Sequence, residues 1–127
     1  YRPGNFIEAE GGGDYFGLPN QRRNKVVVIV DNTTQSFMEY TTMMLQKIPG
    51  MITIGEQTSV ADGNVTSIAL PGNVSAIFTG LDCFYPDGSQ CQGVGVRIDE
   101  VVTPSLKGIR EGRDEMLERA IQILQQK

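Results

Sequence analysis

One serine stands where hydrolases place a nucleophile. The segment VVVIVDNTTQSFMEY, residues 26–40, passes from an aliphatic run typical of a buried strand into a helical pattern, and Ser36 lies at the change. The unpaired N–H groups and positive dipole end of a helix N-terminus suit an oxyanion, and the N–H of Phe37 is the natural first donor. A serine hydroxyl needs a base to take its proton, yet the sequence contains no histidine. Ser36 is therefore a candidate nucleophile whose base is not evident.

The same residues also fit a purely structural role. Ser36 and Glu39 have the Ser-x-x-Glu spacing of a capping box, and Thr33 or Thr34 could cap the helix instead. The glycine-flanked turn of many serine hydrolases is absent. Spacing alone leaves both the nucleophile and the helix cap open.

The elements that would position Ser36 form a strand, helix, strand unit. Lys25–Asp31 is predicted as a strand buried on both faces, because Val and Ile are continuous there. Thr34–Lys47 is predicted as a helix that the IPG at 48–50 ends. Side chains near helical spacing, of which the apolar ones are expected to pack on the sheet, are Phe37, Tyr40, Thr41, Met44 and Leu45. Met51–Gly55 is a short second strand. This order predicts a right-handed crossover in a parallel α/β sheet.

The rest of the chain divides by its turn residues. Residues 1–24 are rich in Gly, Pro and Asn without a period, which predicts a loop or extended arm. Residues 65–98 alternate strand-like runs with the turns PGN and PDG, which predict β-hairpins attached to the parallel unit. Glu111–Gln126 is predicted as a closing amphipathic helix. Its expected apolar face consists of Met116, Leu117, Ala120, Ile121 and Leu124.

Two cysteines, Cys83 and Cys91, flank the segment FYPDGSQ. A hairpin centred on Asp87 would place the two cysteines opposite each other. If they occupied a non-hydrogen-bonded site of the ladder, their Cβ atoms would be close enough for a disulfide. A disulfide would favour an oxidising compartment, whereas the alternative is two reduced, half-buried thiols; both remain open. Two thiols without a histidine supply too few ligands for zinc, so we expect no metal and no other cofactor.

Charge and hydropathy exclude several classes of partner. The net charge of −4 and the pI near 4.7 argue against nucleic acid or an anionic membrane as the main partner. The longest aliphatic run, Val26–Val30, is far too short to span a membrane. The first residues, YRPGNFIEAE, show no signal-peptide pattern and no initiating Met, which predicts a processed or excised segment.

Four segments, taken in order, resemble the tail-specific proteases, also called carboxyl-terminal processing peptidases. They are VIVDNTTQSFMEY, TIGEQTSVADGNV, CFYPDGSQCQGVGV and GIREGRDEMLERAI, and they extend from about Val26 to Ile123. The motifs are most similar to a Bacteroidetes-type branch close to the tricorn-like proteases. The resemblance implies an α/β fold, a ClpP/crotonase-like spiral protease core, of which residues 25–127 would be the C-terminal portion.

The resemblance also implies roles for individual residues. The family nucleophile falls on Ser36, the oxyanion donor on the backbone N–H of Phe37, and a supporting glutamate on Glu39. The lysine base of the common branch falls on Ala61, so that base is missing. The tricorn-like branch uses a histidine from an earlier part of its chain. The base and the second oxyanion donor are therefore expected from an upstream segment.

The implied function is that of a serine-type endopeptidase that cleaves proteins or peptides through an acyl-enzyme. The implied partners are the substrate, the upstream part of the same protease and a further copy in a homo-oligomer, and the implied location is the periplasm or cell envelope. The alternative is a catalytically inactive peptide-binding or assembly module, which Ala61 supports. A third reading, a crotonase-like enzyme acting on acyl-CoA, is disfavoured by the YPDG and GRDE segments.

Overall fold

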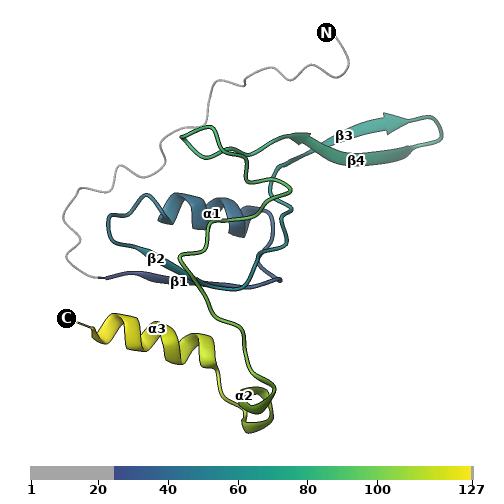
Figure 1. Cartoon of the computed structure of the whole chain (residues 1–127). Helices are drawn as coiled ribbons and strands as arrows, with labels where there is room; N and C mark the ends of the chain where they lie inside the picture. The colour runs from purple at the N-terminus through teal and green to yellow at the C-terminus, as the bar shows by residue number, and fades with distance from the viewer. Residues whose placement is uncertain (1–24, 127) are drawn as a thin grey trace.

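The computed structural model describes residues 25–126, so the arm predicted for 1–24 lies outside the described residues (Figure 1). A parallel sheet forms the centre, with strand order β1-β2-β5. Its strands are β1 (Val27–Val30), β2 (Ile52–Gly55) and β5 (Glu100–Val101). The helix α1 (Phe37–Leu45) connects β1 to β2, as the strand, helix, strand pattern predicts. The mixed α/β class with parallel strands is confirmed.

Close pairing of β1 with β2 depends on one glycine. The strands align from Val27 opposite Ile52 to Val30 opposite Gly55. A Cβ atom added to Gly55 would lie 1.9 Å from the Val30 carbonyl oxygen, and Gly55 has a φ of 125°. Only glycine combines that backbone conformation with so close an approach. The end of the sheet from which the Ser36 turn departs is fixed by this contact.

Helices cover both faces of the sheet (Figure 1). The α1 side is packed by Val30, Met43, Tyr85, Cys91 and Val96. The side of α3 (Glu115–Gln125) is packed by Ile54, Ala120 and Ile123, with Val27 against them. The prediction that β1 is buried on both faces is wrong at Ile29, which is 39% exposed. Ile29 shares the α3 face with Val27, but α3 reaches only the Val27 end.

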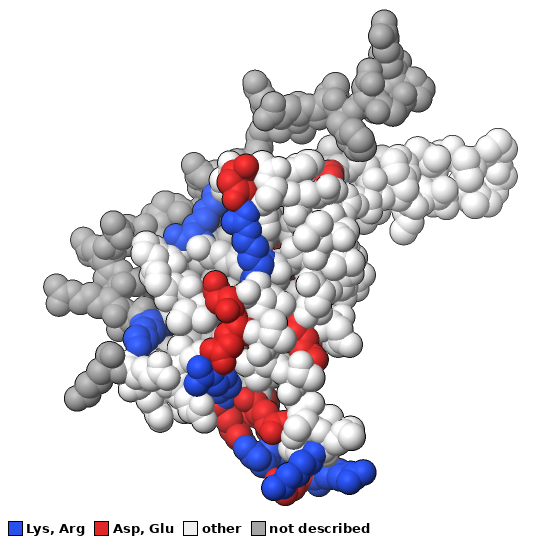
Figure 2. Space-filling view, viewed as in Figure 1, with Lys and Arg blue, Asp and Glu red and all other residues white. Residues whose placement is uncertain are grey.

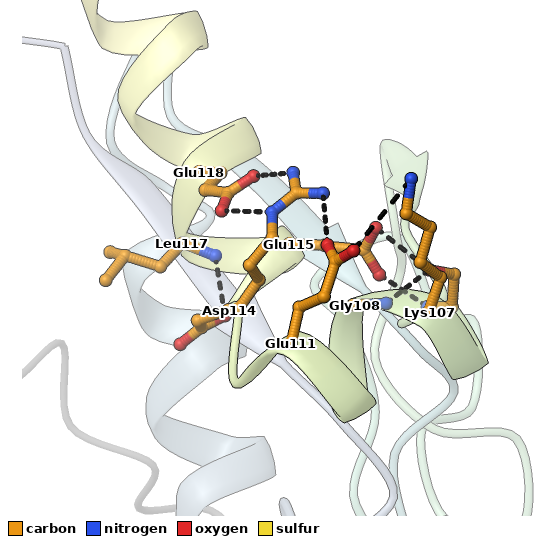
Figure 3. A network of polar contacts seen from close by, with 9 residues as sticks. Lys107, Gly108, Glu111, Asp114, Glu115, Leu117 and Glu118 are labelled. Carbon is orange, nitrogen blue, oxygen red and sulfur yellow. Dashed lines mark hydrogen bonds and ion pairs between the residues drawn. The ribbon is translucent and has the colours of Figure 1, made fainter.

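The predicted closing helix is confirmed as α3, and a short helix that was not predicted precedes it. Gly112, with a φ of 67°, ends α2 (Leu106–Glu111), and the Asp114 side chain then caps α3 by accepting the Leu117 N–H at 2.9 Å (Figure 3). The predicted start at Glu111 is therefore four residues early. The predicted apolar face is also too wide, since Leu117, Ile121 and Leu124 are exposed.

Polar contacts join α2 to α3 (Figure 3). Arg113 Nε donates to Glu118 at 3.0 Å, and the Glu115 carboxylate accepts from the Ser105 hydroxyl at 3.1 Å. Lys107 lies 3.9 Å from Glu111. Exposed pairs of this kind contribute about 0.2–1 kcal/mol each, so they orient the two helices more than they stabilise the fold.

The hairpin predicted around PGN is confirmed as β3 (Asn64–Leu70) and β4 (Val74–Leu81), which pair antiparallel. The second hairpin, around PDG, is reduced to a tight loop with a single bridge between Phe84 and Gln90. The strand predicted after it is wrong, because Gly93 and Gly95 have φ values of 74° and 88° that break extended backbone.

Cys83 and Cys91 do lie opposite each other around Asp87. The Cys91 N–H donates to the Cys83 carbonyl at 2.9 Å, so the pair occupies a hydrogen-bonded site and not the non-hydrogen-bonded site that we expected. Both thiols are free. Of the two alternatives that spacing left open, the structure has the reduced pair.

Among residues 25–126, no helix has both the length and the apolar character needed to cross a membrane.

Ile54→Ala is expected to lower the free energy of unfolding by about 2–5 kcal/mol, because the Ile54 side chain is fully buried between the sheet and α3. Urea denaturation followed by circular dichroism measures this change. Leu117→Ala is the matched control: at 48% exposure it should cost less than about 1 kcal/mol. Equal losses in the two variants would contradict the placement of the core.

Candidate active site

The turn between β1 and α1 holds Ser36 in an unusual conformation. Its φ is 52° and its ψ is −119°, close to the first central residue of a type II′ turn, a position that favours glycine. A non-glycine residue in such a region stores about 1–3 kcal/mol. Nucleophilic serines of hydrolases sit on a sharp, strained strand-to-helix turn of this kind. The glycine signature is absent from the sequence, but the strained geometry is present.

Asp31 shapes the first half of this turn. Its carboxylate oxygen Oδ1 accepts from the Thr33 N–H at 2.9 Å and from the Thr34 N–H at 3.2 Å. The hydrogen bonds from Thr33, the side chain first, hold the pKa of Asp31 below its ordinary value. The polar DNTT segment therefore makes a tight exit from the sheet without a glycine.

The start of α1 has the arrangement of a capping box formed by Ser36 and Glu39. The Glu39 carboxylate accepts from the Ser36 backbone N–H at 3.0 Å, in a capping-box arrangement. The Ser36 hydroxyl lies in the capping-box position toward the Glu39 N–H, but that N–H donates to the Ser36 backbone carbonyl at 2.8 Å and makes no hydrogen bond of normal geometry to the hydroxyl. The N–H of Phe37 has no acceptor among residues 25–126. The Ser36 hydroxyl is thus at most loosely engaged, beside an unpaired N–H at the positive end of a helix.

The side of α1 that faces inward differs from our expectation. The buried residues are Glu39, Thr42 and Met43, whereas Phe37 is 70% exposed. The ring of Phe37 lies beside that of Tyr40, with centroids 6.4 Å apart. Phe37 contributes its backbone N–H to the candidate site, while its side chain does not anchor the helix.

Glu39 is the buried hub of the site. Its side chain is 0% exposed and its carboxylate accepts four hydrogen bonds, which is its full capacity. The oxygen Oε2 accepts from the N–H groups of Ser36 and Ala61, each at 3.0 Å. The oxygen Oε1 accepts from the Thr58 hydroxyl at 2.5 Å and from the Val60 N–H at 3.0 Å. One carboxylate therefore joins the Ser36 turn to the loop at 58–61.

Position 61 lies beside the turn, as the resemblance places it. The backbone N–H groups of Ala61 and Ser36 meet on one carboxylate oxygen, but the side chain of Ala61 is only a methyl group. Its neighbour Val60 has a φ of 56°, a strained value for a β-branched residue. Two strained residues thus contact the same carboxylate, and neither supplies a base.

Asp62 directly follows this loop in the sequence, and its carboxylate lies near the two cysteines. Asp62 is 5% exposed, and its oxygen Oδ2 has no hydrogen-bond partner among residues 25–126. Burial, followed by the nearby Asp62 carboxylate, raises the pKa of the Cys83 thiol far above its ordinary value. The same two causes raise the pKa of Cys91 to about 11. Both thiols therefore stay protonated at neutral pH and are poor nucleophiles.

Two lysines are engaged in other contacts. Lys25 Nζ donates to the Ile123 carbonyl at 3.4 Å, near the C-terminus of α3, and Lys107 pairs with Glu111. Within the described range, no group of three or more His, Cys, Asp or Glu residues is arranged to hold a metal ion.

The structure brings Ser36, Phe37 and Glu39 together at one helix terminus, and all three were candidates from the sequence. Sequence reasoning missed Thr58 and Val60 as partners of Glu39. Thr58 stands in the TIGEQT segment that carries the resemblance, so a signal for it existed. No sequence signal marks Val60, because its contribution is a backbone N–H.

Glu39→Gln should lower the free energy of unfolding by about 3 kcal/mol. The glutamine NH₂ group would replace one carboxylate oxygen, and it cannot accept hydrogen bonds from the donors that surround that oxygen. Amide hydrogen exchange at Val60 and Ala61 should also become faster. Glu56→Gln, at a partly exposed glutamate, is the control and should leave both quantities nearly unchanged. Unaltered exchange in Glu39→Gln would mean that the carboxylate does not hold the loop.

Ser36→Gly should be more stable than Ser36→Ala by about 1 kcal/mol, because glycine relieves the positive φ that alanine retains. Thermal unfolding of the two variants measures the difference. At Gln46, where φ is −62°, the order of the Gly and Ala variants should reverse. The same order at both positions would show that Ser36 is not strained.

Comparison with known proteins supports the fold. A candidate peptidase from Parabacteroides merdae ATCC 43184 superposes with a TM-score of 0.72 at 22% identity, covering 80% of this chain and 32% of that one. Mature CPAF superposes with a TM-score of 0.63 at 18% identity, covering 78% of this chain and 19% of that one. Mature CPAF complexed with lactacystin superposes with a TM-score of 0.65, at the same identity and the same coverage of the two chains. The chain thus spans a third or less of the length of these proteins.

None of the curated proteins is significantly similar to the sequence. The model of peptidase family S41, in contrast, matches residues 5–102. That match covers most of the sequence, including the Ser36 turn, the Glu39 hub and the hairpin. The chain therefore belongs to peptidase family S41.

Proposed function

We propose that this chain supplies the nucleophile of a serine peptidase that cleaves proteins or peptides. The observation that carries the proposal is the conformation of Ser36: a residue with a strained backbone at the N-terminus of α1, directly before the unpaired N–H of Phe37. A residue that only capped the helix would adopt the extended backbone that N-caps prefer and would need no such strain. Membership of peptidase family S41 supports the same reaction class.

In the proposed mechanism Ser36 Oγ attacks the carbonyl carbon of the scissile peptide bond. A base takes the hydroxyl proton, and the negative charge develops on the carbonyl oxygen. The Phe37 N–H, which has no acceptor among residues 25–126, donates to that oxygen, and the dipole of α1 adds to the stabilisation. When the intermediate collapses, the C–N bond breaks, the base gives its proton to the leaving nitrogen, and the amine departs. The acyl-enzyme that remains is then hydrolysed by water.

In this proposal Glu39 positions Ser36 and takes no part in proton transfer. Its carboxylate is occupied by four donors, so it holds the Ser36 turn and takes no proton from the hydroxyl. Removing one oxyanion donor from a serine peptidase costs about 10²–10³-fold in kcat, which indicates how strongly the placement of the Phe37 N–H matters.

The base and the second oxyanion donor come, in our proposal, from a segment upstream of the described residues. Ala61 replaces the lysine of the common branch, and the raised pKa values of Cys83 and Cys91 leave those thiols protonated. A histidine from an upstream segment would act as the general base that takes the proton of the Ser36 hydroxyl. The location in the cell envelope stays a prediction of the resemblance, and the free thiols lend it no support.

A catalytically inactive peptide-binding or assembly module is the second candidate. Ala61 is the observation that favours it, because the described residues near Ser36 then include no base. An inactive relative would have no need of the strain at Ser36, which costs stability. The strained turn therefore favours the peptidase.

Residues 1–127 alone are expected to hydrolyse no peptide bond, since the sequence contains no histidine and the contacts of the Ser36 turn within residues 25–126 include no base. In a longer protein that contains this chain and its upstream segment, Ser36→Ala should lower kcat by at least about 10³-fold with an almost unchanged melting temperature. Cleavage of fluorescent casein measures the rate.

The matched control is Ser67→Ala, which removes an exposed hydroxyl of β3 and should keep full activity. A large loss of stability with activity retained in Ser36→Ala would show that Ser36 is only a helix cap. Cleavage by residues 1–127 that Ser36→Ala abolishes would reveal a base within the chain.

A further inference from the structure

Residues 91–96 lie directly against the loop at 58–61 of the candidate site. The Gly93 N–H donates to the Val60 carbonyl at 2.8 Å. The side-chain amide of Gln57, which directly precedes the loop, donates to the backbone of residues 91–96 at 2.9 Å. We call residues 91–96 the supporting segment, because they form a second layer of structure behind the loop.

Both ends of the supporting segment are fixed by further contacts. At its start the Cys91 N–H donates to the Cys83 carbonyl at 2.9 Å. Directly after its end the Arg97 N–H donates to the Tyr85 hydroxyl at 2.9 Å, and the Arg97 guanidinium lies 4.1 Å from the centroid of that ring. Arg97 also pairs with Asp87 at 2.5 Å, and Figure 2 shows basic and acidic atoms side by side over the loop that follows β4. The segment is therefore held in place against the loop.

The Thr58 hydroxyl joins the supporting segment to the carboxylate of Glu39. It donates to Glu39 Oε1 at 2.5 Å and accepts from the Val96 N–H at 3.3 Å. A hydroxyl has one proton to donate, and here that proton goes to the carboxylate. Thr58 is 4% exposed, so little water competes for either bond. The position of Thr58 Oγ1 is thus fixed from two sides.

Gly95 leaves the room that this hydroxyl occupies. A Cβ atom on Gly95 would lie 2.7 Å from Thr58 Oγ1 and 3.2 Å from Val60 Cγ1. It would also lie 2.1 Å from the amide nitrogen of Gln57, but that long side chain can adopt another rotamer. Thr58 is short, so it can move aside only by giving up its bond to Glu39.

We propose that Gly95 is a positioning residue for the nucleophile, an inference that rests on the proposed function. The absence of a side chain at Gly95 lets Thr58 reach Glu39, and Glu39 in turn accepts from the N–H of Ser36. A methyl group there would displace Thr58 Oγ1 from Glu39 Oε1 and loosen the Ser36 turn. Gly95 acts through two other side chains and is not a catalytic residue.

The backbone conformation of Gly95 would favour glycine in any case, because its φ is 88°. Gly88 separates this effect from the close approach. Its φ is 82°, and a Cβ atom there would meet nothing within 4 Å. Alanine at either position is strained in the same way, but only at position 95 does its methyl group meet Thr58. The difference between the two alanine variants therefore measures the close approach.

Amide hydrogen exchange in residues 1–127 tests the proposal without any need for activity. Gly95→Ala should speed exchange of the Ser36 N–H at least about tenfold relative to the paired amides of β1 and β2, which report opening of the whole fold. Gly88→Ala should leave this ratio unchanged within about twofold. A general loss of stability affects both sets of amides and does not change the ratio.

A double-mutant cycle tests the route through Thr58. Thr58→Ala alone should speed exchange at Ser36, because Glu39 loses a donor. In that background the methyl group of Gly95→Ala meets no hydroxyl oxygen, so it should change the Ser36 ratio by less than about threefold. The double variant also serves if Gly95→Ala alone does not fold.

Kinetics in a longer protein that contains the upstream segment add a second readout. Gly95→Ala should lower kcat at least about tenfold and leave KM within about twofold, because a displaced nucleophile slows the reaction without weakening substrate binding. Gly88→Ala should keep both constants.

Three results would overturn the proposal. An unchanged Ser36 exchange ratio in Gly95→Ala would show that the turn does not depend on this glycine, and equal changes in Gly88→Ala would reduce its role to backbone strain. Additive effects of Gly95→Ala and Thr58→Ala would exclude the route through Thr58. Failure of the proposed function is a different result: Ser36→Ala would then keep full activity in the longer protein, while the exchange ratios would still decide whether Gly95 holds the turn.

Discussion

The buried carboxylate of Glu39 is the interaction on which the site depends. An ionisable group at 0% exposure is costly unless its oxygens are satisfied, and here four donors satisfy them. Two of those donors belong to residues with positive φ values, Ser36 and Val60. Hydrogen bonds to a charged group contribute about 1.5–3 kcal/mol each, whereas each strained residue costs about 1–3 kcal/mol. The four bonds therefore outweigh the strain of two residues, and the turn keeps its shape without a substrate.

The same contacts bear on the choice between a helix cap and a nucleophile, which the sequence leaves open. In a full capping box the serine hydroxyl and the glutamate each satisfy one N–H of the other residue. Here Glu39 accepts from the Ser36 N–H at 3.0 Å, whereas the Glu39 N–H donates to the Ser36 carbonyl at 2.8 Å and reaches the hydroxyl of the capping box only loosely. The start of the helix is thus secured mainly by Glu39 and the backbone. In the proposed mechanism, this leaves the Ser36 hydroxyl available for attack.

The sequence predicted the parts of the fold that rest on local chemistry. Continuous Val and Ile gave the paired strands β1 and β2, and PGN gave the hairpin of β3 and β4. The sequence-based predictions failed where the structure depends on long-range strand pairing or on an unusual backbone conformation. The strand β5 has two residues and exists only because β2 pairs with it, and Gly93 and Gly95 end a strand that alternation favours. At the site, residue types indicated Ser36, Phe37 and Glu39. The loop that completes the Glu39 hub offers mainly backbone N–H groups, which residue types do not reveal.

In the proposed mechanism, backbone donors would allow the residue that acts as the base to differ while Ser36 keeps its position. Ala61 contributes to the hub through its N–H, and its exposed side chain takes no part in holding the turn. A lysine or an alanine at position 61 therefore leaves the Glu39 contacts intact, because both residues present the same N–H. The proposed mechanism can therefore separate the positioning of Ser36 from the removal of its proton. The positioning depends on residues 36 to 61, and a base from a different segment would leave the strained turn undisturbed.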